Sequence, residues 1–201
     1  MTQTHQLDSS VKIKQYVVVT LICGVFGGAA LSPLLMQGIP LMRQMTDPAA
    51  EKFGLVLIVS LGSGLLFLPG LLAYSITHGK GIAFLTQLLV GIVMGVLTPY
   101  FGDMLFSNVL TGVLLEATIF AVTRYKPTTY KLMGWIGASL SILAAIGSFI
   151  GHGALGLTLL QATAIGVLTI FAFVGLALAV QFWGDRVQNL GWINLFSAQE
   201  V

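Results

Sequence analysis

Charged residues are scarce in this sequence, and cysteine is almost absent. Only 8% of the 201 residues are charged and 56% are hydrophobic, with a mean hydropathy of +0.94. Water-soluble domains carry about 25% charged residues, so the composition excludes that class and indicates an integral membrane protein. The single cysteine, Cys23, lies in an apolar run, which excludes a disulfide framework or a thiolate metal cluster within one chain.

Enzyme signatures are also missing. The sequence has no Walker loop, no His-Glu-x-x-His, no Gly-x-Ser-x-Gly elbow and no pair of intramembrane carboxylates to act as acid and base. We therefore expect a protein that is not an enzyme, with no cofactor and no metal site. Without an ATP-binding element, active transport would need energy from a partner or from an ion gradient.

Six apolar runs organise the chain, each close to the roughly 20 residues that cross a bilayer core of about 30 Å. They predict an all-α membrane protein, a bundle of six transmembrane helices forming a single domain over residues 1–201. The runs lie near residues 15–36, 53–76, 82–98, 104–123, 132–150 and 157–183. The first run has no small-residue cleavage site and is longer than a signal-peptide core, so we expect it to be retained.

Positive residues lie mostly on one side of the predicted membrane, and this asymmetry gives the orientation. With the N-terminus in the cytoplasm, only Arg43 and Lys52 are external. The cytoplasmic set is Lys12, Lys14, Lys80, Arg124, Lys126, Lys131 and Arg186. Both termini are then cytoplasmic, with residues 1–14 as a tail. Loop asymmetry accounts for the net charge of +2, so no nucleic-acid partner is expected.

The longest connection, residues 38–52, lies on the external side. Its Asp47-Pro48 pair predicts the start of the second helix, because Asp caps free amides and Pro fits the first turn. Two interpretations stay open for this segment. It is either a solvated loop or a lid that covers an external pocket and buries apolar residues such as Ile39 and Met42.

Small residues follow one another at four-residue steps in two of the predicted helices. Thr20, Gly24 and Gly28 form such a row in the first helix, and Gly91 and Gly95 repeat it in the third. Small residues at this spacing let transmembrane helices approach closely. The row in the first helix therefore serves internal packing or forms a docking surface for a partner protein.

Glu116 is the only acidic residue deep inside a predicted span. Eight residues separate it from Arg124 at the cytoplasmic end, about 12 Å along a helix, which places its backbone near mid-bilayer. A charge at that depth costs about 2.5–3.5 kcal/mol or more, so such residues face the bundle interior and often mark function. Glu116 is either a protonated brace between helices or part of a ligand or proton site.

Other polar residues could join Glu116 in one cavity. Asn108 and Gly112 precede it at four-residue steps on one helical ridge. Gln87 in the third run and Gln161 in the sixth are further buried hydrogen-bonding groups, although each could equally bond two helices. Tyr100 and His152 lie on the external side, where an aromatic ring could stack on a flat ligand.

Four other aromatic residues lie at the opposite, cytoplasmic end of the predicted helices. Tyr125, Trp135, Trp183 and Trp192 are expected to form the aromatic belt at that interface, since Trp and Tyr favour headgroup depth.

Several short motifs resemble the substrate-binding S-components of energy-coupling factor (ECF) vitamin transporters. They comprise Ala73-Tyr74 before a turn with Gly81, Pro99 at the third external turn, the pattern G-x-x-x-E-A-x-x-F-x-x-T-R over residues 112–124, and Asp185, Gly191 and Asn194 in "GDRVQNLGWIN". More specifically, the chain resembles the family for thiamin and hydroxymethylpyrimidine, the YkoE-like proteins. Members of that family place further acidic residues in the third helix, where this chain has Gln87 and Val93. This difference leaves a neutral pyrimidine or another vitamin precursor open.

The resemblance implies a subunit of the bacterial plasma membrane that captures a vitamin-sized ligand in its external half. It also implies partners: a membrane coupling subunit, docked on the first helix, and two cytoplasmic ATPases. The polar contacts would come from Asn108, Glu116, Gln87 and Gln161, with Tyr100 and the lid covering the ligand. Two other functions stay open, a proton-coupled carrier that uses Glu116 and a structural membrane protein.

Overall fold

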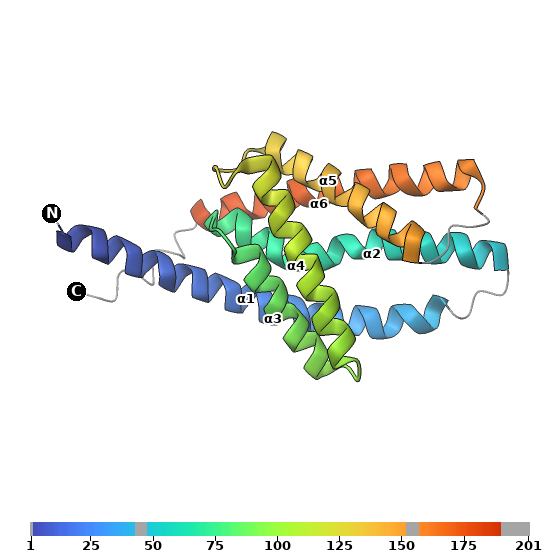
Figure 1. Ribbon diagram of the computed structural model, residues 1–201, viewed down its shortest axis with the longest axis horizontal. Helices are drawn as coiled ribbons and strands as arrows, with labels where there is room; N and C mark the ends of the chain where they lie inside the picture. The colour runs from blue at the N-terminus through green and yellow to red at the C-terminus, as the bar shows by residue number, and fades with distance from the viewer. Residues whose placement is uncertain (1, 43–47, 152–156, 190–201) are drawn as a thin grey trace.

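The computed structural model describes residues 2–42, 48–151 and 157–189. Every secondary-structure element in these ranges is a helix, as Figure 1 shows. The helices are α1 (Thr2–Met42), α2 (Pro48–Thr77), α3 (Ile82–Leu97), α4 (Phe101–Thr123), α5 (Tyr130–Gly151) and α6 (Leu159–Asn189). The predicted all-α bundle of six helices is confirmed, and α2 begins at Pro48 as expected.

The connection expected at residues 38–52 is shorter in the structure. Residues 38–42 belong to α1 and residues 48–52 to α2, and only 43–47 lie outside the described ranges. The lid interpretation therefore stays a prediction. At the other end of α1, the segment expected as a tail is helical from Thr2, and the apolar span begins at Lys12.

Five of the described helices are long and apolar enough to cross a membrane by length and composition. The exception is α3, whose 16 residues cover about 24 Å. Its end has a local cause: Thr98 precedes Pro99 and adopts an extended backbone with φ −126°, because a following proline disfavours helical geometry.

The central helix is α2, which contacts each of the other five helices. Its residues Phe67, Leu71 and Tyr74 form a buried core with Phe173 and Ala177 of α6. In Figure 1, α3 and α4 lie side by side and cross the long axis of the bundle at an angle. As a result, α4 lies beside both α2 and α5. These contacts lie in the half of the bundle that contains the starts of α2 and α4.

Candidate functional site

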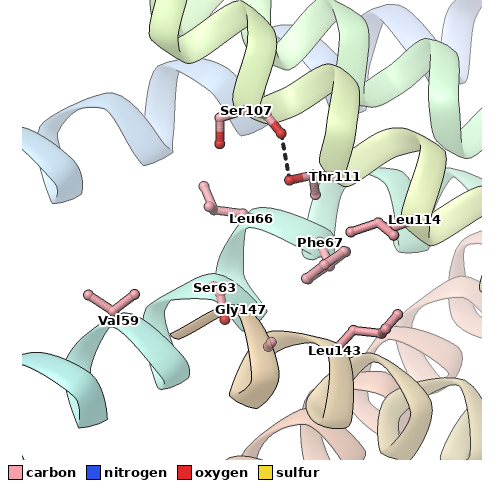
Figure 2. Close-up of a pocket in the computed structure, with 10 residues that line it drawn as sticks. Val59, Ser63, Leu66, Phe67, Ser107, Thr111, Leu114, Leu143 and Gly147 are labelled. Atoms are coloured by element: carbon pink, nitrogen blue, oxygen red, sulfur yellow. Dashed lines mark hydrogen bonds between the residues drawn. The ribbon is translucent and has the colours of Figure 1, made fainter. Parts of the chain in front are cut away.

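A cavity of about 210 Å³ lies between α2, α4 and α5 (Figure 2). Its wall includes Ser63 and Phe67 of α2, Ser107 and Thr111 of α4, and Gly147 of α5. These positions belong to the first two thirds of α2, the first half of α4 and the last turns of α5. The cavity therefore lies in the half of the bundle that the charge asymmetry assigns to the external side.

Hydroxyl groups supply the polar part of the cavity wall. The Ser63 hydroxyl donates to the carbonyl of Ser60 at 2.7 Å, and the Thr111 hydroxyl donates to the carbonyl of Ser107 at 2.8 Å. Each hydroxyl hydrogen is thus used within its own helix, which leaves oxygen lone pairs for a ligand. None of the lining residues is charged. The wall suits an uncharged ligand that donates hydrogen bonds.

These hydroxyl residues were not predicted as site candidates, since Ser and Thr are common in membrane helices. The one available signal is the four-residue step from Ser107 to Thr111, which places both on one face of α4. That face is next to the ridge of Asn108, Gly112 and Glu116, but it points in a different direction. The neighbouring ridge carries the larger polar side chains of Asn108 and Glu116, so it is the more obvious candidate in the sequence.

The ridge faces α3 and packs against it. A Cβ added to Gly91 would lie 2.9 Å from the Cβ of Asn108, and one added to Gly112 would lie 3.0 Å from the Cβ of Gln87. The two antiparallel helices therefore alternate, with each glycine opposite a larger residue of the other helix. The structure brings Asn108, Gln87 and Glu116 together at the α3–α4 interface.

Asn108 and Gln87 each keep one buried oxygen without a hydrogen-bond partner in the described part of the chain. Their amide nitrogens are engaged: Gln87 Nε2 donates to the carbonyl of Leu66 at 2.6 Å, and Asn108 Nδ2 donates to that of Met104 at 2.8 Å. Leu66 lines the cavity, so Gln87 supports its wall from behind. An unpaired buried acceptor costs about 1–3 kcal/mol, which makes these two oxygens unusual.

Glu116 binds the start of α3. The N–H of Gly81 donates to Oε1 at 2.7 Å, and the N–H of Phe84 donates to Oε2 at 3.3 Å. The hydroxyl of Tyr125 also donates to Oε1 at 2.7 Å. These amides belong to the first turn of α3, where a carboxylate from another helix can replace a local cap. Glu116 thus joins the α2–α3 turn, α4 and the loop after α4.

Tyr125 was expected in the aromatic belt, but its hydroxyl points to Glu116. Burial and the hydrogen bond to Glu116 raise the pKa of Tyr125 to about 12, with burial as the larger cause. The phenol therefore keeps its proton and remains a donor at neutral pH.

A second chain of hydrogen bonds ties the same end of the bundle together. The Thr128 hydroxyl donates to Gln181 Oε1 at 2.8 Å, so His78 Nε2, 2.9 Å from that hydroxyl, is the donor in their contact. Gln181 Nε2 donates to Asp185 at 2.6 Å. Burial lowers the pKa of His78, and the nearby charge of Asp185 opposes that shift. His78 is therefore neutral at neutral pH.

Two motif residues of the ECF resemblance meet nearby. The Tyr74 hydroxyl lies 3.0 Å from that of Thr123, and Tyr74 is fully buried. Gln188 Nε2 also donates to the carbonyls of Ser75 and Ile76, at 2.9 and 2.8 Å, which fastens the end of α6 to the end of α2. Tyr74 and Thr123 thus lie at the end of the bundle opposite the cavity.

The remaining predicted site residues are separate from this group. Gln161 forms a capping box with Thr158: its Oε1 accepts the Thr158 N–H at 2.9 Å, and its own N–H donates to the Thr158 hydroxyl at 3.3 Å. Tyr100 precedes α4 and is 50% exposed. His152 lies outside the described residues. The substrate-binding role of these residues stays a prediction.

The small residues of α1 pack within the chain. A Cβ on Gly24 would lie 2.7 Å from Leu89, and one on Gly28 would lie 2.8 Å from Val93, both side chains of α3. Thr20 is half-buried on the same helix. Gly24 and Gly28 therefore serve internal packing, because side chains of α3 occupy the space beside them.

Comparison with known proteins supports the fold. No protein-family model matches the sequence, and no curated protein matches it at a significant level. A solved structure described as "Crystal structure of an S-component of ECF transporter" superposes with a TM-score of 0.68 and 19% sequence identity, over 90% of this chain and 88% of that chain. The chain therefore shares the helical fold of an ECF S-component.

Proposed function

We propose that this chain is the substrate-binding S-component of an ECF-type, ATP-driven importer. The observation that carries the proposal is a fold similar to that of an S-component over nine tenths of the chain. The cavity between α2, α4 and α5 adds a place for a ligand. With the basic end of the bundle in the cytoplasm, that cavity lies in the outer half of the membrane, where a subunit that captures substrate from outside needs it.

The proposed substrate is a vitamin or vitamin precursor, with hydroxymethylpyrimidine favoured over thiamin. Drug-sized pockets measure about 300–1,000 Å³, so a cavity of about 210 Å³ suits a single ring. Its uncharged wall offers no carboxylate to the cation of thiamin. Hydroxymethylpyrimidine is neutral, and its hydroxyl can donate to the lone pairs of Ser63 and Thr111.

Within this proposal, the predicted site residues divide by position. Gln87 donates to the carbonyl of Leu66, a residue of the cavity wall, and both Gln87 and Asn108 keep an unpaired buried acceptor. Tyr100 and Gln161 belong to the external end, where they would cover the ligand, and the same role for His152, outside the described residues, stays a prediction. Glu116, with its oxygens bound to three donors, is proposed as a brace that does not touch substrate.

The proposed partners are a membrane coupling subunit and two cytoplasmic ATPases. Because α3 fills the Gly24 and Gly28 face, docking on α1 would use its outward side. That side exposes Ile22 and Phe26, which are four residues apart, at 51% and 71%. An apolar helix face of this kind suits contact with another membrane helix.

The test begins with the compound that remains bound after gentle purification, identified by mass spectrometry, and with calorimetric titration of hydroxymethylpyrimidine and thiamin. Thr111→Val should weaken binding about three- to tenfold, the worth of one hydrogen bond of about 0.5–1.5 kcal/mol. Thr118→Val is the matched control, because its hydroxyl also donates four residues back at 2.8 Å but does not line the cavity. Equal losses in both variants, or no binding by the wild type, would contradict the proposed site.

A further inference from the structure

The loop after α4 holds two side chains in a strained backbone conformation. Arg124 has φ 50° and Tyr125 has φ 59°, both in the left-handed region. A residue that ends a helix in this region is usually glycine, because any other side chain costs about 1–2 kcal/mol there. A non-glycine residue kept in such a position suggests that its side chain has a role.

The side chain of Tyr125 has a hydrogen-bond partner inside the protein, whereas that of Arg124 has none among the described residues. The Tyr125 hydroxyl binds Glu116. Among the described residues, no hydrogen bond or ion pair engages the guanidinium of Arg124, which is exposed. The nearby carboxylate of Glu116 is bound to the amides of α3 and to Tyr125. Arg124 therefore presents its charge outward.

A second cation, Lys80 of the α2–α3 turn, lies close to Tyr125. The ammonium of Lys80 lies 5.8 Å from the centre of the Tyr125 ring, a cation–π contact. That ring lies 5.6 Å from the ring of Phe120, one turn before Arg124 on α4. Lys80 thus lies over one of two paired rings, Arg124 is the neighbour of Tyr125 in the chain, and both cations are exposed.

An apolar stripe runs along α4 and ends at Arg124. Val113, Ala117 and Phe120 follow at steps of four and three residues, so they share one face with Arg124. Val113 is 50% exposed and Phe120 55%, and Ala117 between them is exposed and small. Arg124 is the first residue after the candidate span Phe101–Thr123, at the depth where phosphate groups lie.

We propose that Arg124 and Lys80 form a binding site for an anionic phospholipid of the cytoplasmic leaflet. The phosphate group binds between the guanidinium and the ammonium, and an acyl chain lies along the stripe of Val113, Ala117 and Phe120. Arg suits phosphate because its planar fork donates two parallel hydrogen bonds. A lipid is favoured over an acidic protein because the stripe faces the bilayer and continues directly into the cations.

The test compares the protein in nanodiscs of phosphatidylcholine with and without phosphatidylglycerol. Native mass spectrometry counts the retained phosphatidylglycerol, and thermal unfolding gives the stabilisation that this lipid provides. Arg124→Gly keeps the fold intact, because glycine adopts φ 50° without strain, and should unfold no earlier than the wild type in phosphatidylcholine alone. Its affinity for phosphatidylglycerol, like that of Lys80→Gln, should fall about fivefold.

Lys131→Gln is the control, since it removes an exposed cation from the same end of the bundle but outside the proposed site. It should keep the preference of the wild type for phosphatidylglycerol. The proposal is wrong if Arg124→Gly also keeps that preference, or if Lys131→Gln loses it to the same extent. Equal stabilisation by inorganic phosphate would indicate a site for free anions, and no difference between the two lipid compositions would show that the anionic headgroup is not recognised; either result overturns the lipid site.

Discussion

At the scale of single residues, Glu116 is an acid in the bundle with three hydrogen-bond donors. Its two oxygens accept from Gly81, Phe84 and Tyr125, so it acts as the cap that α3 lacks in its own sequence. The sequence predicted a place in the bundle interior near mid-bilayer, whereas two of its partners, Gly81 and Tyr125, belong to the α2–α3 turn and the loop after α4. It could not show that the partner is a helix start, because Gly81 is 35 residues away.

Glu116→Gln should lower the free energy of unfolding by about 1–3 kcal/mol, because an amide can offer only one acceptor oxygen to the buried N–H groups. Thermal unfolding in detergent measures this loss. Asp103→Asn, a carboxylate-to-amide change in the exposed first turn of the same helix, should cost less, about 0.3–1 kcal/mol. An unchanged melting temperature together with lost proton-coupled uptake would favour the carrier alternative.

Tyr125 gives a residue-scale prediction for alkaline pH. Its pKa is raised to about 12 in the folded protein, mainly by burial and then by its bond to Glu116, against about 10 when unfolded. Above pH 10 the folded state therefore holds a proton that the unfolded state releases. The stabilisation is complete below pH 10 and is lost as the pH rises towards about 12.

The measurement is the free energy of unfolding as a function of pH for the wild type and Tyr125→Phe. The difference between the two proteins should be constant up to pH 10 and shrink towards about pH 12. Taking the difference removes the contributions of the other tyrosines. A difference that stays flat through this window would mean that the phenol does not hold its proton in the folded state.

At the scale of helices, α3 and α4 pack through alternating glycines and larger residues. Gly91→Ala should destabilise the protein by about 1–3 kcal/mol, because the new Cβ would meet the Cβ of Asn108 at 2.9 Å and the backbone of Leu105 at 3.3 Å. Gly175→Ala in α6 is the control, since a Cβ there meets nothing within 4 Å. Denaturation in detergent should show a loss only for Gly91→Ala.

Helix positions could be predicted from the sequence, whereas helix partners could not. Apolar runs and prolines such as Pro48 and Pro99 located the six elements to within a few residues, apart from the longer ends of α1 and α6. The facing surfaces were hidden because a membrane helix is apolar on every side, so hydrophobic periodicity does not distinguish lipid from core. The ridge of Asn108 and Glu116 was recognised, but its neighbour, α3, was not.

At the scale of the whole molecule, the two ends of the bundle differ in chemistry. The end near Gly81 is joined by hydrogen bonds that link α2, α3, the loop after α4 and α6. The other half contains the cavity and the unpaired oxygens of Ser60, Gln87 and Asn108. Polar groups in the first half satisfy one another, so the second half is the better place for a ligand to bind.

This difference is tested by filling the cavity without disturbing the fold. Gly147 lines the cavity from α5, and a Cβ there meets nothing within 4 Å, so Gly147→Phe can place its ring in the open space. Substrate affinity should fall at least about tenfold, equivalent to about 1.4 kcal/mol, while the melting temperature is retained. Gly175→Phe, with equal room but on α6, should bind the substrate as the wild type does. If both variants bind equally well, the ligand does not occupy the space between α2, α4 and α5, and the chain would need a different site for any substrate.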